Sequence, residues 1–267
     1  MTRRTLITSS ANDRLKAVRR LARRRDPCVF LVEGHRQLQR ALEADAALRE
    51  VYAAPDLFLG ECDHELLLVA ERRGVRIVEL GAAAFRSLSH GTRPDGLLAV
   101  AERWPTALSG LVPGADALIL VAEGIERPGN LGTIVRSACS AGATGLVACD
   151  TTTDVFHPDA VHGSVGTLFH LPVAQCASEH AVSWLREQGI AIVVATPDGD
   201  RPCWSADLTH AVALVVGSER HGVSDTWRRA ADVSVSIPMP GPSDSLNVAV
   251  AAGVVLFEAV RQRSRDR

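Results

Sequence analysis

The sequence predicts an α/β protein built from two domains. Short apolar runs typical of β-strands alternate along the chain with segments of helical periodicity, and glycine-containing turns follow several of these runs. The alternation is interrupted at residues 105–114, which are rich in proline, glycine and small side chains. With 267 residues, of which 46% are hydrophobic, the chain is long enough for two ordinary domains. We therefore place a first domain at 1–104, a linker at 105–114 and a second domain at 115–267.

The first domain is predicted to be a small α/β layer. Its apolar runs indicate strands at 29–32, 48–53, 75–78 and 97–100. Helices are expected at 34–42 and 65–73, and a short one around 85–88.

A strongly basic helix is expected before the first of these strands. From residue 3 to residue 25, which includes Arg3 and Arg4, the chain carries eight arginines and one lysine against a single acid. Apolar residues between 15 and 22 recur at helical spacing, which predicts an amphipathic helix with a cationic outer face. Two interpretations stay open: a merely solvated helix face, or contact with RNA phosphates. The candidate RNA contacts are Arg14, Arg19, Arg20, Arg23 and Arg24.

The second domain is predicted to hold an open parallel sheet. Continuous apolar runs indicate buried strands at 117–122, 145–148, 191–195 and 212–216. Helices are expected at 179–188 and from Asn130, as the cap, to Ala141, with Gly142 ending the helix. Loops begin where predicted strands end, at 196, at 217 and at the proline-rich stretch from 237. Because ligands of open α/β sheets bind at the carboxyl ends of strands, we expect these three loops to form one site.

The stretch 237–250 combines a rigid loop with an unusual helix. Three prolines and a glycine within residues 238–242 exclude a helix or a central strand there. Ser245 is expected to cap a helix that follows through Val260, and residues 246–257 contain no charged side chain. A helix that is apolar on nearly all sides is usually buried on two of them. The second side predicts a homodimer built on this C-terminal helix.

Composition excludes several classes of protein. No apolar run approaches the ~20 residues of a membrane span, and the polar, then basic N-terminus has no signal-peptide pattern. The six cysteines show no C-x-x-C pairing, so we expect free thiols in a reducing cytoplasm, without a metal site. The formal net charge is −2, and nucleic-acid binding would therefore depend on local patches. No dinucleotide or P-loop phosphate motif is present, which disfavours a nucleotide-phosphate site.

Three motifs of the second domain occur in a fixed order: NLG at 130–132 with Arg136, GSERHG at 217–222, and IPM at 237–239 with SLNV at 245–248. They resemble the three signatures of the SpoU–TrmH family of RNA ribose 2′-O-methyltransferases. In the first domain, ITSSAN at 7–12 and FLVEG at 30–34 are similar to the substrate-binding domain of many SpoU rRNA methyltransferases. That domain has the fold of a small RNA-binding ribosomal protein.

The resemblance implies a SPOUT-type fold whose C-terminal half is threaded into a trefoil knot, and S-adenosylmethionine as cofactor. This cofactor has no phosphate, and backbone groups of tight Gly/Pro loops can bind its adenine, which fits the missing phosphate motifs. By resemblance, the residues that line the cofactor are Thr196, Gly217, Ile237, Met239 and Leu246.

The resemblance also implies the catalytic residues. Arg136 matches the catalytic arginine of the family. Because a guanidinium group keeps its proton up to a pKa above about 12, we expect Arg136 to hold the 3′ phosphate and the developing alkoxide rather than to act as a base. Asn130 and Asn247 would orient Arg136 or the ribose, Ser245 would bond the substrate, and Glu219 would anchor the loops.

Structural alternatives to these roles stay open. Arg136 could pair with Glu126 or Glu219, Asn130 and Ser245 could only cap helices, and Glu219 could form a structural salt bridge.

Three further residues near these motifs are expected to matter less for catalysis. His162 stands where most relatives carry an arginine, and both it and His157 are expected to be structural. Arg220 stands where a glycine is commoner and would add a cation near the RNA.

The implied function is transfer of a methyl group from S-adenosylmethionine to a ribose 2′-hydroxyl of ribosomal RNA, 23S rRNA first. The alternatives are a tRNA 2′-O-methyltransferase, an rRNA methyltransferase of antibiotic self-resistance, and a non-catalytic RNA-binding factor of ribosome assembly.

Overall fold

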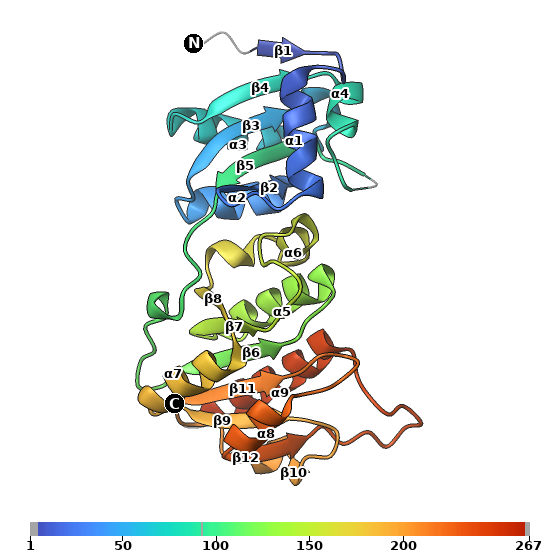
Figure 1. The fold of residues 1–267 in the computed structure, drawn as a ribbon. Coiled ribbons are helices and arrows are strands. Elements are labelled where there is room, and N and C mark those ends of the chain that lie inside the picture. The colour runs from blue at the N-terminus through green and yellow to red at the C-terminus, as the bar shows by residue number, and fades with distance from the viewer. Residues whose placement is uncertain (1–4, 92, 265–267) are drawn as a thin grey trace. The chain divides into compact units, whose positions relative to one another are not determined.

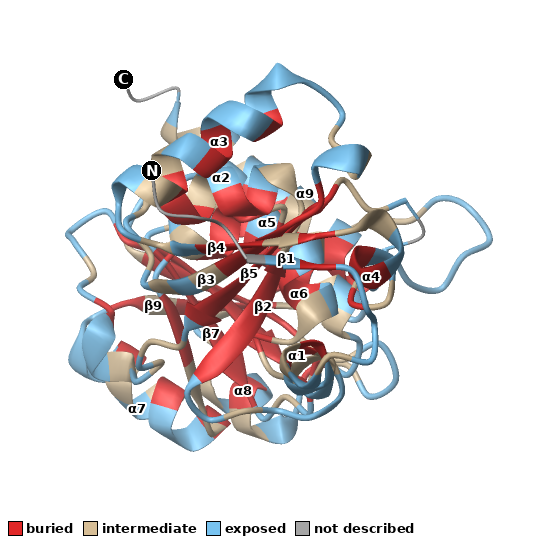
Figure 2. Ribbon diagram, turned by 90° about the horizontal axis from the view of Figure 1, so that it is seen from above, coloured by how far each residue is buried: buried red, intermediate tan, exposed pale blue. Residues whose placement is uncertain are grey.

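The computed structural model describes residues 5–91 and 93–264 of the chain. These residues form two compact units (Figure 1). The first unit comprises Met1–Trp104 together with Val155–His170, and the second comprises Pro105–Asp154 together with Leu171–Arg267. In both units most of the strands are largely buried (Figure 2). No helix among the described residues is long and apolar enough to cross a membrane.

The first unit contains a five-stranded mixed sheet. The strand order is β1-β4-β3-β5-β2, with β5 antiparallel to both of its neighbours and the other pairs parallel. The elements of the first hundred residues are β1 (Thr5–Ile7), α1 (Asp13–Arg23), β2 (Val29–Glu33), α2 (His35–Glu43), β3 (Leu48–Ala53), α3 (Glu61–Arg72), β4 (Arg76–Leu80), α4 (Ala82–Arg86) and β5 (Leu97–Glu102).

The predicted elements of this unit are confirmed except at three places. The three-residue edge strand β1 was not predicted, because so short a strand leaves no periodic signal. Helix α3 begins at Glu61, four residues before the predicted start, and Asp63 explains this early start. One oxygen of its carboxylate, Oδ2, accepts the backbone N–H groups of Leu59 (2.8 Å) and Gly60 (3.2 Å) just before the helix. Helix α4 ends at Arg86 instead of residue 88.

The basic N-terminal helix is confirmed as amphipathic. Leu15 and Val18 are fully buried in the core of the first unit, while the basic side chains lie on the other face. Arg3 and Arg4, which belong to the predicted basic stretch, lie outside the described residues.

The second unit contains the predicted open sheet, and all of its strand pairs are parallel. The strand order is β10-β12-β9-β11-β6-β7-β8. Its elements are β6 (Leu118–Glu123), α5 (Pro128–Ser140), β7 (Gly145–Cys149), β8 (Val173–Cys176), α7 (Ser178–Glu187), β9 (Ala191–Ala195), β10 (Arg201–Pro202), β11 (Val212–Val216), α8 (Asp225–Ala230), β12 (Val233–Ser236) and α9 (Val248–Arg263).

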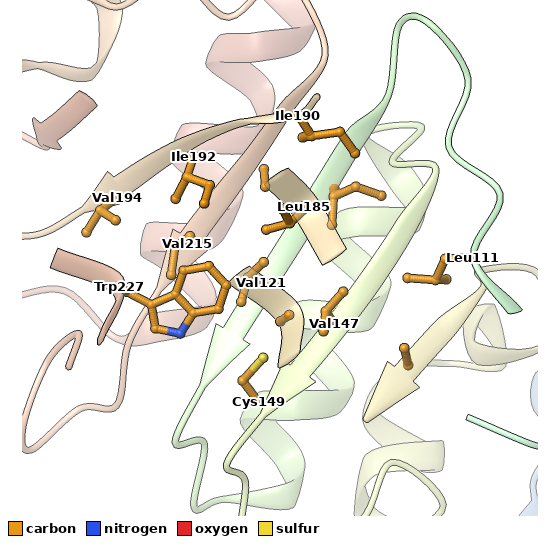
Figure 3. Packing of buried hydrophobic residues seen from close by; sticks show 14 of the residues in the cluster. Leu111, Val121, Val147, Cys149, Leu185, Ile190, Ile192, Val194, Val215 and Trp227 are labelled. Carbon is orange, nitrogen blue, oxygen red and sulfur yellow. The ribbon is translucent and has the colours of Figure 1, made fainter. Parts of the chain in front are cut away.

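Helices cover both faces of this sheet. Helices α5 and α9 pack against each other and on strands β6 and β11, while α7 and α8 pack on strand β9. Trp227 of α8 is completely buried beside Ile192, Val194 and Val215, and its indole N–H donates to Ser178 Oγ at 2.8 Å (Figure 3). The central strands are apolar on both faces because both faces are covered. The knot implied by the family resemblance stays a prediction.

The segment Val155–His170 groups with the first unit, although the predicted boundaries put it in the second domain. It contains helix α6 (Pro158–Gly163). Two side chains of α2 bind its backbone: Gln37 Nε2 donates to the carbonyl of His162 (3.4 Å) and Arg40 Nη1 to that of Val165 (2.7 Å). A connection between two strands of the second sheet thus packs on the first unit. The boundaries at 104 and 115 stay a proposal.

Candidate active site

A pocket of about 270 Å³ lies where strands β9, β11 and β12 end. These strands are neighbours in the sheet, so their carboxyl ends meet at one edge, and the start of α9 closes the pocket. The predicted convergence of the three loops is therefore confirmed. The five residues predicted to line the cofactor all contribute to its wall: Thr196, Gly217, Ile237, Met239 and Leu246. That they bind the cofactor stays a prediction.

Gly217 has a steric role in this pocket. A Cβ atom at Gly217 would lie 2.2 Å from the backbone carbon and oxygen of Gly222, closer than real side chains allow. The loop closes on itself there, since the N–H of Gly222 donates to the carbonyl of Ser218 at 2.9 Å. Only glycine permits this approach of two backbone segments. The tight loop holds Glu219 and Arg220 at its tip.

The wall of the pocket fits the chemistry of S-adenosylmethionine. Apolar side chains, among them Ile237 and Val248, form a surface of the kind that suits an adenine ring. The backbone N–H and C=O groups of Met239 and Leu246 make no hydrogen bond to any described residue, so they are available to a ligand. No cluster of cations is needed, because this cofactor carries no phosphate.

A polar cluster joins the three motifs. Asn247 Nδ2 donates to Glu219 Oε1 at 3.2 Å and to Asn130 Oδ1 at 3.3 Å, and Asn130 Nδ2 also donates to Glu219 Oε1. Arg127 Nε lies 3.8 Å from Glu219 Oε2. One carboxylate thus links the start of α5, the loop after β11 and the start of α9. This arrangement agrees with the expected role of Glu219 as an anchor of the loops.

Two predicted helix caps are wrong. Asn247, and not Ser245, caps α9, because its Oδ1 accepts the backbone N–H of Ala249 at 3.0 Å. Asn130 does not cap α5; it is the third residue of that helix, which begins at Pro128. Asn130 therefore points its amide into the polar cluster instead of closing a helix end. Ser245 lines the pocket, which leaves its hydroxyl group at the site.

Arg136 lies apart from the polar cluster. It is exposed on α5, six residues after Asn130, which corresponds to about 9 Å along a helix. Its guanidinium group forms no hydrogen bond or ion pair with any described residue. The alternative in which it pairs with Glu126 or Glu219 is therefore not realised. This cation is available to a ligand on the surface of the helix.

A second, smaller pocket of about 180 Å³ adjoins the first. It shares Glu219, Arg220 and Val248 with the larger pocket, and Asn130 and Arg127 complete its polar wall. Arg220 thus lies between the two pockets, and its expected role as a cation near the RNA stays a prediction. Sequence reasoning did not select Arg127 as a site residue. The signal that could have identified it is its position directly before Pro128, the first residue of α5.

The basic side chains of α1 differ in whether they have hydrogen-bond partners within the protein. Arg14 Nε donates to the hydroxyl of Tyr52 at 3.1 Å and Nη2 binds Glu50, so this predicted RNA contact has structural partners. Arg19 Nη2 donates to the carbonyl of Ser10 at 2.7 Å. Three guanidinium groups have no hydrogen bond or ion pair to a described residue: those of Arg20 and Arg23 in α1, and that of Arg24, the extended residue directly after the helix.

Both histidines singled out by sequence have structural contacts, as predicted. His157 caps α6, and its Nδ1 accepts the backbone N–H of Asp159 at 3.2 Å. His162 Nδ1 lies 3.5 Å from Nε2 of Gln37.

One group of potential metal ligands comes together among the described residues: His35, Cys62 and Asp63. Both oxygens of the Asp63 carboxylate already have partners, since Oδ1 lies 2.6 Å from His35 Nδ1 and Oδ2 accepts two backbone N–H groups. The fold alone explains this arrangement, and we assign no metal to it.

Comparison with known proteins identifies both parts of the chain. A model of the SpoU rRNA methylase family matches residues 117–257, and a model of the MRM3-like substrate-binding domain matches residues 12–99. Over 247 residues the chain is 35% identical to a 23S rRNA (uridine(2479)-2′-O)-methyltransferase of Streptomyces viridochromogenes, covering 89% of this chain and 84% of that protein. Over 201 residues it is 34% identical to the 23S rRNA (guanosine-2′-O-)-methyltransferase RlmB of Xanthomonas campestris, covering 73% and 81% respectively.

Solved structures of similar proteins agree over both units. A crystal structure of an RNA 2′-O ribose methyltransferase matches with a TM-score of 0.87 at 35% identity, covering 97% of this chain and all 100% of that one. The SpoU methyltransferase AviRb of Streptomyces viridochromogenes, in complex with the cofactor AdoMet, matches with a TM-score of 0.85 at 31% identity, covering 96% and 100%. The chain therefore belongs to the SpoU rRNA methylase family.

Proposed function

We propose that this SpoU methylase transfers the methyl group of S-adenosylmethionine to a ribose 2′-hydroxyl of 23S ribosomal RNA. The observation that carries the proposal is the meeting of the pocket and the polar cluster at one edge of the sheet, where they share Glu219. The similar proteins named above support it, because two of them are named as 23S rRNA 2′-O-methyltransferases.

The residues of the site have different roles in the reaction. When bound, S-adenosylmethionine supplies an electrophilic methyl group. Asn130, Glu219 and Asn247 hold one another in place and orient the ribose that enters the smaller pocket. Arg136 binds the phosphate on the 3′ side and stabilises the negative charge that develops on the 2′ oxygen. Because a guanidinium group donates hydrogen bonds and has no acceptor atom, the proton of the hydroxyl leaves to another acceptor.

Ribosomal RNA as substrate is testable directly. We expect the purified protein to methylate protein-free 23S rRNA with S-adenosylmethionine at a single ribose, and 16S rRNA and tRNA not at all. Mapping ribose methylation in RNA from cells with and without the protein should give the same nucleotide. Methylation of tRNA alone would establish the tRNA alternative, and cofactor binding without methylation of any RNA would favour the ribosome-assembly factor.

The basic face of α1 is proposed to bind RNA phosphates. Reversal of charge at Arg20, Arg23 and Arg24 to glutamate should weaken RNA binding and flatten its salt dependence, because each lost phosphate contact lowers the slope by about 0.7 to 0.9. Affinity for S-adenosylmethionine should not change, since α1 belongs to the other unit. Filter binding over a series of salt concentrations measures the slope.

A matched control for this experiment is Arg72→Glu, which reverses an exposed arginine of α3 in the same unit. A triple variant with the slope of the wild type would leave α1 as a solvated helix face.

A homodimer built on α9 is also proposed. Val250, Val254 and Phe257 are 52%, 39% and 50% exposed, and they recur along one face of the helix. The opposite face of α9 is buried against its own unit, so the helix is apolar on two sides as predicted. A cytoplasmic location is proposed together with the rRNA substrate.

A further inference from the structure

Thr196 lies in the wall of the larger pocket, and all of its polar groups have partners within the protein. Its hydroxyl donates to Asp198 Oδ1 at 2.6 Å and accepts from Arg228 Nη2 at 3.1 Å. Its backbone N–H donates to the carbonyl of Val235 at 2.9 Å, and its carbonyl accepts the N–H of Gly199 at 3.1 Å. A threonine hydroxyl has one proton to donate, and here that proton goes to Asp198. Thr196 therefore offers a ligand its surface but no hydrogen-bond donor.

Arg228 of α8 holds this arrangement from outside the pocket. Its Nη1 donates to Asp198 Oδ2 at 3.1 Å and to Oδ1 at 3.3 Å, and its Nη2 donates to Oδ1 at 3.3 Å. Its Nε donates to the carbonyl of Val223 at 3.3 Å. Thr196 and Val223 both line the pocket but follow different strands, β9 and β11. One planar guanidinium group therefore ties two of the three pocket loops together.

The loop that follows β12 is coupled to the loop that follows β9 by close backbone packing. A Cβ atom at Gly199 would lie 2.2 Å from the backbone carbon of Val235 and 2.6 Å from the nitrogen of Ser236. The loop after β9 is thus pressed against the end of β12. The chain continues directly from there to Ile237, which lines the pocket. Any displacement of Thr196 and Gly199 therefore displaces the strand end that carries Ile237.

We propose that Arg228 and Asp198 are positioning residues for the cofactor: they fix the loop of Thr196, and through it the pocket wall, without touching the ligand. This proposal rests on the proposed function, because the ligand of the pocket is taken to be S-adenosylmethionine. Among the described residues, Arg228 reaches the pocket wall through its hydrogen bonds to Thr196 and to Val223.

The pair is expected to act over the whole physiological pH range. Hydrogen bonds from Thr196 and then from Arg228 lower the pKa of Asp198 to about 2. A carboxyl group with a lowered pKa stabilises the folded arrangement fully above its unfolded pKa of about 3.9. This stabilisation is lost as the pH falls through the folded pKa of about 2. The positioning effect should therefore be constant between pH 5 and 9, as far as this pair determines it.

The test compares two neighbouring arginines of α8. Arg228→Met should weaken S-adenosylmethionine binding by about tenfold in isothermal titration calorimetry, while kcat at saturating cofactor stays within about twofold. Arg229→Met is the matched control, because Arg229 is exposed and its one hydrogen bond to a described residue runs from Nε to the carbonyl of Asp225 in the same helix. Its affinity should equal that of the wild type. Asp198→Asn, with Asp200→Asn as its control in the same loop, repeats the comparison with smaller changes of shape.

A mutant cycle separates positioning from direct contact. If the hydroxyl of Thr196 acts only through Arg228 and Asp198, Thr196→Val should cost no further affinity in a protein that already carries both Arg228→Met and Asp198→Asn. Additive losses would mean that Thr196 bonds the cofactor itself, and wild-type affinity in both Arg228→Met and Asp198→Asn would overturn the proposal. A wild-type protein that binds no S-adenosylmethionine would instead contradict the proposed function.

Discussion

Replacement of Arg136 by alanine is expected to lower methyl transfer by roughly two to three orders of magnitude, the usual cost of removing a group that stabilises developing negative charge. Affinity for S-adenosylmethionine should stay within about threefold, because Arg136 does not line the larger pocket. The side chain is exposed and has no ionic partner among the described residues, so its removal breaks no contact that holds the fold. Single-turnover methylation of 23S rRNA and calorimetry with the cofactor measure the two quantities separately.

Two variants make the Arg136 experiment specific. Thr133→Ala changes another exposed residue of the same face of α5, whose hydroxyl donates only to the carbonyl of Gly129 within the helix, and it should retain activity. Arg136→Lys keeps the charge but loses the planar fork that matches a phosphate. Its methyltransferase activity should therefore lie between that of Arg136→Ala and that of the wild type. Wild-type turnover in Arg136→Ala would remove this residue from the mechanism.

The division of labour between Arg136 and the polar cluster follows from their surroundings. Glu219 already accepts hydrogen bonds from Asn130 and Asn247, so its charge is used to hold the loops together. A free cation about two helical turns away is the group that remains for the phosphate and the alkoxide. The two sets of residues should therefore respond differently to mutation: Glu219→Gln should disturb the pocket as well as catalysis.

The sheet of the second unit could be predicted from sequence because its central strands are buried on both faces. Such strands are continuous apolar runs, as at Val212–Val216 and Ala191–Ala195, and they end at glycine or threonine. The elements that were missed are short: strands β8, β10 and β12 have two to four residues, and helices α6 and α8 have six. Their existence depends on neighbours in space, which a periodic pattern does not record.

Sequence reasoning predicted the loops and most residues of the candidate site, but not the hydrogen bonds that join them. The carboxyl-end rule located the three loops, and the motifs located Asn130, Glu219 and Asn247. Which side chain caps α9 depended on one hydrogen bond: the sequence favoured Ser245, while the structure shows Asn247 Oδ1 accepting from the N–H of Ala249. The link from Arg228 to Thr196 joins positions 32 residues apart and carries no sequence signal. Sequence patterns identify which residue types are present, and packing decides which of them meet.

The exposed face of α9 leads to the second large expected effect. Three large apolar side chains on one face of a helix are costly to leave in water, and a symmetric contact between two copies of the helix would bury them. A specific dimer needs only about 800 Å² of buried surface on each subunit. Leu246, which is 38% exposed and lines the larger pocket, stands just before this helix. A contact along α9 would therefore support the pocket from the partner side.

Val254→Arg should accordingly yield monomers that have lost most of their methyltransferase activity, although no group of the reaction has been changed. An arginine at the centre of an apolar contact would have to be buried without a partner, which costs several kcal/mol. The variant should still fold, because Val255, Leu256 and Ala259 carry the buried face of the helix. Light scattering should give about twice 28.5 kDa for the wild type and 28.5 kDa for the variant. Val112→Arg, the same substitution at a residue 88% exposed, is the control and should remain dimeric and active. A wild-type mass near 28.5 kDa at micromolar concentration would refute the dimer, and an active monomeric Val254→Arg would show that the site is complete within one subunit.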